Sequence, residues 1–248
     1  MTTMSGSEVF EDLEAEYAHL DGLLAGLDPE QWGLESGAAG WSVADVVLHL
    51  AQSEELVLAS IAGDRDAFGR QDGTPLDELM DQRVVSERGS GSQVLARWRE
   101  AAGATPGALR ACPPDTRLSW ATIPLSPRTL ATTRLAEHWA HTLDVMAPLG
   151  LDYPDTARLR HIAWLGHRTL PYAFAVAGRE GGPVFCELTG PSGELWRFGD
   201  PEAPSAITGP AGQFCRVGAH RLPPSETALE TRGPHAEAAL RVMRNYAV

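Results

Sequence analysis

The chain has 248 residues, 43% of them hydrophobic and 21% charged, values that are ordinary for a globular protein with its own core. Its formal net charge is −13 at pH 7, and Arg is its sole strong base because the sequence contains no Lys. This balance argues against binding to nucleic acid or to anionic membrane surfaces, since both require clustered basic side chains.

Cysteines and the N-terminus give further expectations. Cys112, Cys186 and Cys215 are widely spaced and predict no disulfide framework. The opening segment MTTMSGSEVFEDLEAEY lacks the basic and apolar regions of a signal peptide. No apolar run reaches the ~18 residues of a membrane span. We therefore expect a cytoplasmic protein.

The first part of the chain predicts helices. Apolar residues recur every three or four positions over residues 7–27, a pattern typical of an amphipathic helix that ends at the following Asp-Pro pair. A second helix is expected over residues 42–63. Ser42 is its N-cap, and Asp45 lies three positions on, as in a capping box.

Two more long helices follow a looser segment. Residues 64–91 are rich in Gly and Asp and contain one helix near residues 75–87. A long helix then runs from about Ser92 to a Pro-Pro pair, and another runs from Pro127 to a Pro-Leu-Gly stop. Four long helices with connections of mixed length predict a four-helix bundle over residues 1–151.

The second part of the chain mixes helices and strands. A helix is expected over residues 154–178, with Pro171 as a kink or a break. Apolar and polar residues alternate over residues 183–199 around Gly-Pro-Ser-Gly, which predicts a β-hairpin. The remaining elements complete a small α+β domain at residues 152–248: a short helix over 209–222, a short strand over 227–233 and a closing helix over 234–248. The expected fold class is α+β.

The segment RLAEHWAHTLDV, residues 134–145, carries the residues best suited to chemistry. Glu137 and His141 are four positions apart and share a helix face, whereas His138 is turned about 100° from Glu137. Two ligands are too few for a divalent metal, and His49 on the apolar face of the second helix is the best third candidate. Two histidines and one carboxylate leave an open position, as in catalytic zinc sites and non-haem iron(II) sites.

Each of these residues also has a simpler interpretation. The E-x-x-x-H spacing fits a surface ion pair and is frequent by chance. His49 alone fits a core histidine with one hydrogen bond. The combination favours a metal site, although spacing does not choose between zinc, iron, nickel and cobalt. His138 is expected on the bundle surface or hydrogen-bonded to a ligand, and Asp45 either caps its helix or orients the imidazole of His49.

The remaining candidates lean toward structural roles. Trp120 and Ser126 lie in the connection before the fourth helix, where they are candidates for the mouth of a pocket. His161 and His167 are six positions apart and do not share a helix face, so no metal pair is expected there. The cysteines are expected to be buried small residues. Four tryptophans are expected to contribute to packing: Trp41, Trp98, Trp120 and Trp139.

Two segments, GWSVADVVLHLAQSEE and RLAEHWAHTLDV, together resemble the mycothiol-dependent maleylpyruvate isomerase family, a branch of the DinB-like four-helix bundles. In that family a G-W-(S/T)-x-x-(D/E)-x-x-x-H-L segment supplies the first metal histidine, which matches His49. An E-x-x-x-H on the fourth helix supplies the other ligands, which match Glu137 and His141. The resemblance implies zinc as the metal and an up-down-down-up bundle.

The resemblance continues into ITGPAGQFCRVGAHRL and ETRGPHAEAALRVMRNYA, which are similar to the family's C-terminal α+β domain. An Arg late in that segment contributes to activity in the family, and Arg221 holds the matching position. Its guanidinium either pairs with a substrate carboxylate or forms a structural salt bridge at a helix end. His220 is a weaker additional candidate.

The implied chemistry uses a zinc-bound thiolate, with mycothiol, the small thiol of actinobacteria, as cofactor. Reversible addition to an electron-poor double bond gives a cis–trans isomerase, and a thiol that stays attached gives an S-transferase. The expected substrate is small and carboxylated. Two alternatives remain open, because a scaffold with an open metal site does not fix its reaction. One is a metal-dependent biosynthetic enzyme without a thiol cofactor, and the other is a non-catalytic metal-binding or sensor protein.

Overall fold

The computed structural model describes residues 8–64, 67, 74–121 and 123–245. The chain divides into two compact units, and the boundary between them in the sequence lies between Tyr153 and Pro154. Tyr153 is tied to the N-terminal unit because its hydroxyl donates to a carboxylate oxygen of Glu16 at 2.6 Å and its ring stacks on His19. The boundary expected from the sequence, between residues 151 and 152, lies just before this tie.

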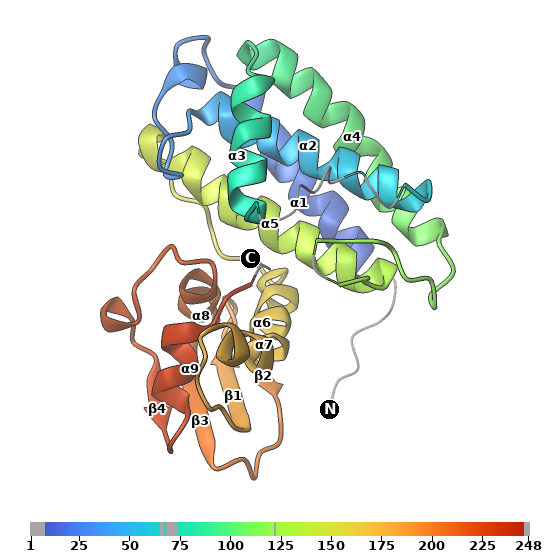
Figure 1. The fold of residues 1–248 in the computed structure, drawn as a ribbon. Helices are drawn as coiled ribbons and strands as arrows, with labels where there is room; N and C mark the ends of the chain where they lie inside the picture. The colour runs from blue at the N-terminus through green and yellow to red at the C-terminus, as the bar shows by residue number, and fades with distance from the viewer. Residues whose placement is uncertain (1–7, 65–66, 68–73, 122, 246–248) are drawn as a thin grey trace. The chain divides into compact units, whose positions relative to one another are not determined.

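Helices make up the N-terminal unit (Figure 1). In the described residues they are α1 (Glu8–Leu24), η1 (Gln31–Gly33), α2 (Val43–Ile61), α3 (Leu76–Ser86), α4 (Gly91–Ala111), α5 (Pro127–Met146) and η2 (Ala147–Leu149). The four long helices and the short one near residues 75–87 were all expected from the sequence. No helix among the described residues has both the length and the apolar character needed to cross a bilayer.

Local capping fixes the start of the two helices that carry the candidate ligands. At α2, the Asp45 amide donates to Ser42 Oγ at 3.2 Å and the Ser42 amide donates to Asp45 Oδ2 at 2.9 Å, so the expected capping box is present. At α5, Pro127 occupies the first turn, where a missing N–H costs nothing, and the Thr129 amide donates to Ser126 Oγ at 3.2 Å.

Ion pairs between helices show how the bundle is connected. Arg88 and Arg97, at the start and middle of the α4 region, pair with Asp45 and Glu55 of α2 in the same order, so α2 and α4 are parallel. Helices α1 and α4 are antiparallel, because their ion pairs run in opposite order: Arg99–Asp21 and Arg110–Glu14. Helices α2 and α5 are antiparallel for the same reason, with the pairs His49–Glu137 and Glu54–Arg134. The bundle is therefore up-down-down-up, as the family resemblance implies.

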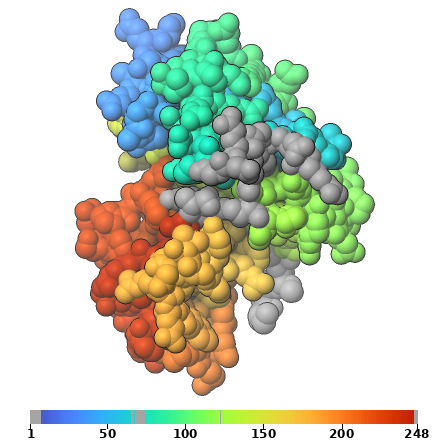
Figure 2. Space-filling model, viewed as in Figure 1, coloured from blue at the N-terminus to red at the C-terminus, as the bar shows by residue number. Residues whose placement is uncertain are grey.

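The parallel α2–α4 pair needs a long connection, and α3 lies within it. The helix packs on the outside of the bundle, where the Gln52 side chain of α2 donates to the Arg83 carbonyl at 3.2 Å. In the space-filling view of Figure 2 the teal surface of α3 is open to solvent. This placement leaves the α2–α5 interface to the candidate metal ligands.

The C-terminal unit combines helices with a four-stranded sheet (Figure 1). Its elements are α6 (Leu159–Arg168), α7 (Leu170–Val176), β1 (Val184–Thr189), β2 (Leu195–Phe198), β3 (Ser205–Pro210), α8 (Ala211–Gly218), η3 (Pro224–Glu226), β4 (Glu230–Arg232) and α9 (Ala236–Val242). The strand order is β2-β1-β3-β4, with β1 antiparallel to β2 and parallel to β3, and β3 antiparallel to β4. The α+β fold class is confirmed.

One face of this sheet forms part of the unit's core. Cys186 of β1 pairs with Phe198 of β2 and with Ile207 of β3, and all three side chains are buried. Leu188 and Trp196 form the next buried pair on the same face. This alternation explains why residues 183–199 were recognisable as a hairpin from their sequence.

The sequence-based elements of this unit need three corrections. The helix expected over 154–178 begins only at Leu159 and divides into α6 and α7 just before Pro171, which lacks the amide that would continue the first helix. No strand was expected at β3, because Ser205–Pro210 has no apolar alternation: its first three residues are all buried. The closing helix, expected to reach residue 248, ends at Val242, and its last three predicted residues lie outside the described part.

Candidate metal centre

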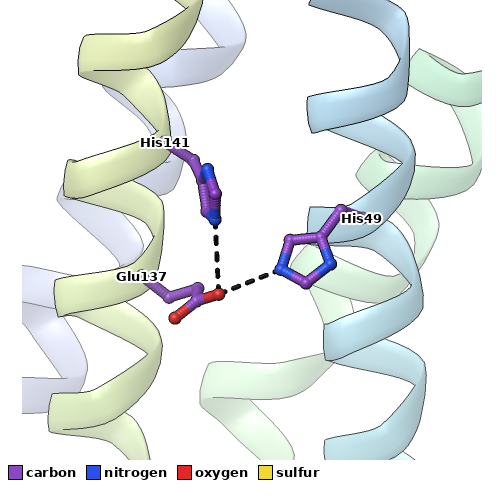
Figure 3. A group of neighbouring side chains, drawn as sticks. All are labelled: His49, Glu137 and His141. Atoms are coloured by element: carbon purple, nitrogen blue, oxygen red, sulfur yellow. Dashed lines mark hydrogen bonds and ion pairs between the residues drawn. The ribbon is translucent and has the colours of Figure 1, made fainter. Parts of the chain in front are cut away.

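Three side chains from α2 and α5 converge on one point in the N-terminal unit (Figure 3). His49 Nε2 lies 3.0 Å from Glu137 Oε1, and His141 Nε2 lies 3.4 Å from the same oxygen. The ligand atoms of all three residues lie within 4.8 Å of one another. We call His49, Glu137 and His141 the outer cluster. It is the one group of this kind found among the described residues.

The geometry of the outer cluster fits a divalent metal. Zinc bonds to His nitrogen and carboxylate oxygen are about 2.0–2.2 Å long, so two ligand atoms at a tetrahedral angle are separated by about 3.3 Å. The two measured separations, 3.0 and 3.4 Å, bracket this value. The side chains are 9%, 25% and 14% exposed for His49, Glu137 and His141, so the carboxylate remains accessible to a small molecule.

A fourth residue holds His141 in the orientation that a metal ligand needs. Nδ1 of His141 donates to Asp144 Oδ2 at 2.9 Å, and the Asp144 side chain is 3% exposed. A proton fixed on Nδ1 leaves the Nε2 lone pair directed at the outer cluster. Metal-binding histidines are generally oriented by such a carboxylate or carbonyl partner.

His49 is held differently, by aromatic packing. Its ring centroid lies 5.0 Å from that of Trp41, which also stacks at 6.3 Å on His141. The Trp41 indole N–H donates to Asp81 of α3 at 2.8 Å. Nδ1 of His49 is buried and has no hydrogen-bond partner among the described residues. Asp45 does not orient His49, because its carboxylate oxygens accept from Ser42 N and from the guanidinium of Arg88.

Proton affinities follow from this crowding. Burial lowers the pKa of His49, although its hydrogen bond to Glu137 partly opposes the change. Burial disfavours the charged form of Glu137, but hydrogen bonds from His141 and His49 outweigh it and hold the pKa of this carboxyl well below its usual range. Burial likewise opposes protonation of His141, yet Asp144 and Glu137 raise its pKa above the ordinary value. A carboxylate between two imidazoles is suited to a cation.

A second polar group lies one helical turn away and is completely buried. Arg134 Nε donates to Glu54 Oε1 at 2.7 Å, with side-chain exposures of 4% and 0%. The Trp98 indole N–H donates to His138 Nε2 at 3.0 Å, and His138 Nδ1 donates to the Arg134 carbonyl at 3.0 Å. We call Glu54, Arg134, His138 and Trp98 the inner cluster. The expectation that His138 lies on the bundle surface or bonds to a ligand is wrong.

Trp41, which packs against His49 and His141, also lines a pocket of about 940 Å³. The pocket lies between the end of α1, η1, the start of α2 and the segment that leads into α4. Trp32 and Leu95 contribute apolar surface, and Arg88 and Ser90 contribute polar groups. The pocket is an open hollow rather than an enclosed cavity, and His49, Glu137 and His141 are not among the residues that line it.

The other residues named from the sequence take structural positions. Trp120 lies under the guanidinium of Arg134, at 5.5 Å, and Ser126 caps α5. His161 is buried, and His167 donates to the Val184 carbonyl at 2.9 Å. The cysteines are free thiols, and burial raises the pKa of Cys186 to about 12, which makes it a poor nucleophile at neutral pH.

Comparison with known proteins now identifies the family. Residues 13–146 match the mycothiol maleylpyruvate isomerase N-terminal domain family, and this match includes every residue of the outer cluster. The chain belongs to this family. The expectation drawn from the two quoted segments is confirmed at the level of the family.

Relatives of this maleylpyruvate isomerase family member extend the likeness beyond the bundle. The uncharacterized proteins Rv0036c and MT0041 of Mycobacterium tuberculosis strains H37Rv and CDC 1551 are each 35% identical to it over 201 residues, which is 79% of this chain and 78% of theirs. Two crystal structures of the mycothiol-dependent maleylpyruvate isomerase, one of them a mutant, superpose with TM-scores of 0.60 and 0.62. Both cover 95% of this chain and all of their own, at 17% and 14% identity, and so share its fold.

In the C-terminal unit, Arg221 follows the end of α8. His220 has a left-handed backbone with φ of 58°. The His220 amide donates to the Val217 carbonyl and the Arg221 amide donates to the Arg216 carbonyl, the bonds of a Schellman helix end. The Arg221 guanidinium donates to the Ala219 carbonyl at 2.6 Å, and His220 Nε2 donates to the Met243 carbonyl at 3.1 Å. His220 therefore ends the helix, and Arg221 is positioned directly after it.

The sequence did not single out Asp144, Glu54 or Arg134. Asp144 was visible in principle, because H-x-x-D on a helix places the carboxylate one turn from the imidazole. Glu54 and Arg134 are 80 positions apart, and no local pattern relates them. Their pairing emerges only from the packing of α2 against α5.

Proposed function

We propose that this protein is a metal- and mycothiol-dependent enzyme of the maleylpyruvate isomerase type, with zinc held by His49, Glu137 and His141. The proposed reaction is cis–trans isomerisation or S-transfer on a small carboxylated substrate, in the cytoplasm. One observation carries the proposal: three ligand atoms from two helices converge within 4.8 Å in a chain whose family uses mycothiol. Three protein ligands leave a coordination position for a thiol.

The residues around this position have separable tasks. Bound zinc would lower the pKa of a thiol ligand, so that the thiolate is present at neutral pH. Glu137 contributes the negative charge of the ligand set, and Asp144 fixes the proton of His141 on Nδ1. Trp41 shields both imidazoles, and the pocket beside it has room for the rest of a small ligand.

Arg221 is proposed to bind the carboxylate of the substrate. The proposal rests on the family resemblance and on the chemistry of guanidinium, which pairs with carboxylates through two parallel hydrogen bonds. The chain has a formal charge of −13, so an anionic substrate needs such a local cation. Arg221→Lys should raise KM for a carboxylated substrate and leave the metal content unchanged, which steady-state kinetics and elemental analysis test together.

The first test is elemental analysis of the purified protein beside His49→Ala and His141→Ala. We expect about one equivalent of zinc in the native protein and its loss in both variants, with the far-UV circular dichroism unchanged because the bundle core remains. Native protein that holds no metal, even after incubation with zinc, would contradict the proposal.

The second test separates thiol chemistry from other uses of the metal. In the cobalt(II)-substituted protein, added mycothiol should produce a sulfur-to-cobalt charge-transfer band, and His49→Ala should lack it. Maleylpyruvate isomerisation should then require both mycothiol and metal. A protein that binds metal but not the thiol would be a sensor, or, if another activity depends on His49, a biosynthetic enzyme without the thiol.

A further inference from the structure

We infer that Asp144 and the turn at Gly37 form a positioning device for His141, which sets the affinity of the outer cluster for its metal. This inference rests on the proposed metal site and extends it to residues that bind no metal themselves. Asp144 is the positioning residue, and Gly37 is the contact that holds Asp144 in place.

The first part of the device is the Asp144–His141 hydrogen bond. Its length is 2.9 Å, and Asp144 lies one helical turn after His141 on α5. Because Asp144 is almost completely buried, its carboxylate has few alternative positions. The same hydrogen bond selects the imidazole tautomer whose Nε2 is free to bind a cation.

The second part is the close approach of the backbone at Gly37. The Gly37 amide donates to the Asp144 carbonyl at 2.9 Å. A Cβ added at Gly37 would lie 3.0 Å from both Cα and Oδ1 of Asp144, closer than ordinary van der Waals contact. Only glycine lets the two backbones approach this closely without moving Asp144.

The turn at Gly37 also leads directly to the other support of the outer cluster. Ser36 Oγ donates to the Trp41 carbonyl at 2.8 Å, and the Ser36 amide donates to the same oxygen at 2.9 Å. Trp41 then packs at a tilt against the ring of His49 and stacks on that of His141. Residues 36–41 therefore connect Asp144 with Trp41, the two residues that hold His141. A shift of Gly37 or of Trp41 would displace His141.

The test measures metal affinity by competition with a chelator in the full-length protein. Asp144→Ala should weaken zinc binding about 10–100-fold, the effect typical of losing a hydrogen-bond partner of a metal ligand. Asp144→Asn should weaken it less, because the amide oxygen still accepts from Nδ1. Gly37→Ala should also weaken binding, although it removes neither a ligand nor the carboxylate.

Two controls separate positioning from general destabilisation. Gly33→Ala changes a nearby glycine whose added Cβ has no atom within 4 Å, and it should bind zinc as tightly as the native protein. Tyr153→Phe removes a buried hydrogen bond to Glu16 and should lower the midpoint of urea unfolding without changing metal affinity. The cobalt(II) spectrum should change in Asp144→Ala and Gly37→Ala and stay native in both controls.

The outcomes are distinguishable. If native protein binds zinc and Asp144→Ala and Gly37→Ala bind it equally tightly, the positioning device is disproved while the metal site stands. If native protein and Gly33→Ala bind no zinc, the proposed function itself fails. If Asp144→Ala does not fold, Asp144→Asn and Gly37→Ala carry the same comparison.

Discussion

The outer and inner clusters both bring Glu and His side chains of α2 and α5 together, and the inner one adds Arg134 of α5 and Trp98 of α4. They differ in what their polar atoms contact. In the inner cluster the Glu54 charge is matched by Arg134, and both nitrogens of His138 are engaged. In the outer cluster two imidazoles are directed at a single carboxylate oxygen. The inner cluster contains its own cation, Arg134, whereas the outer one is suited to an added cation.

This difference shows why a histidine-rich helix does not by itself define a metal site. His138 and His141 are three positions apart, and both lie within a turn of Glu137. His138 is saturated by Trp98 and by a backbone carbonyl, so it has no nitrogen left for a metal. The partners from neighbouring helices decide which histidine is a candidate ligand.

The largest expected effect comes from breaking the inner cluster. Arg134→Met should lower the free energy of unfolding of the metal-free protein by about 3–5 kcal/mol, because it leaves Glu54 buried without its partner. Urea denaturation measures this. Glu137→Gln, which alters the partly exposed outer carboxylate, serves as the control and should cost much less. Equal costs would remove the proposed distinction between the clusters.

The next effect tests the two histidines directly. His141→Gln removes a ligand and should therefore weaken zinc binding by more than about 100-fold. Losing only the hydrogen-bond partner of a ligand has a smaller effect. His138→Gln should retain the metal and lower stability instead, since Trp98 loses its acceptor in the buried layer. Metal loss on changing His138, with retention on changing His141, would reverse the assignment.

Acidification should act through the inner cluster. Burial, followed by the charge of Arg134, holds the pKa of His138 well below its usual value of about 6.5. Below pH 6.5 the unfolded chain therefore takes up a proton that the folded protein refuses, and stability falls with pH. Between pH 7.5 and 5.5 this group should cost about 1.4 kcal/mol.

Urea unfolding of the metal-free protein at both pH values measures this cost. Because other groups also titrate, the comparison is with His138→Gln, which should lose about that much less stability over the same interval. An identical pH dependence in the two proteins would show that His138 is not held neutral by the fold.

The smallest expected effect concerns Trp41, which packs against the histidines of the outer cluster and lines the pocket. Trp41→Phe keeps an aromatic ring beside the histidines and removes the indole donor to Asp81. Since this hydrogen bond is exposed, we expect a loss of about 1 kcal/mol or less in stability and little change in zinc affinity. A large loss of affinity, measured by chelator competition, would show that the indole hydrogen bond to Asp81, and not the aromatic ring alone, holds the histidines in place.

Much of the fold was predictable because the helices carry strong local signals. The capping box at Ser42 and the Pro-started helix at Pro127 fix the ligand-bearing helices from sequence alone. β3 was missed because it is a short buried strand without alternation, and its position beside β1 depends on pairing across an intervening hairpin. The local sequence pattern of a strand does not indicate which distant strand it pairs with.

The candidate site was only partly predictable, for a related reason. Glu137 and His141 follow from helical spacing, and His49 follows from its apolar surroundings. The placement of His138 was wrong because its 100° rotation from Glu137 was taken to direct it away from the core. Helix α5 contacts α1, α2 and α4, so its buried arc is wide enough to include both faces.

The outer cluster joins residues 88 positions apart in the sequence, and this separation has a kinetic consequence. The complete ligand set comes together only when α2 and α5 pack, an event that requires closing a long loop. If that packing completes after the folding barrier, bound zinc should slow unfolding strongly while hardly changing the folding rate. The metal would then stabilise the bundle kinetically: it would bind only after the bundle has assembled, and it would have to dissociate before the bundle could unfold.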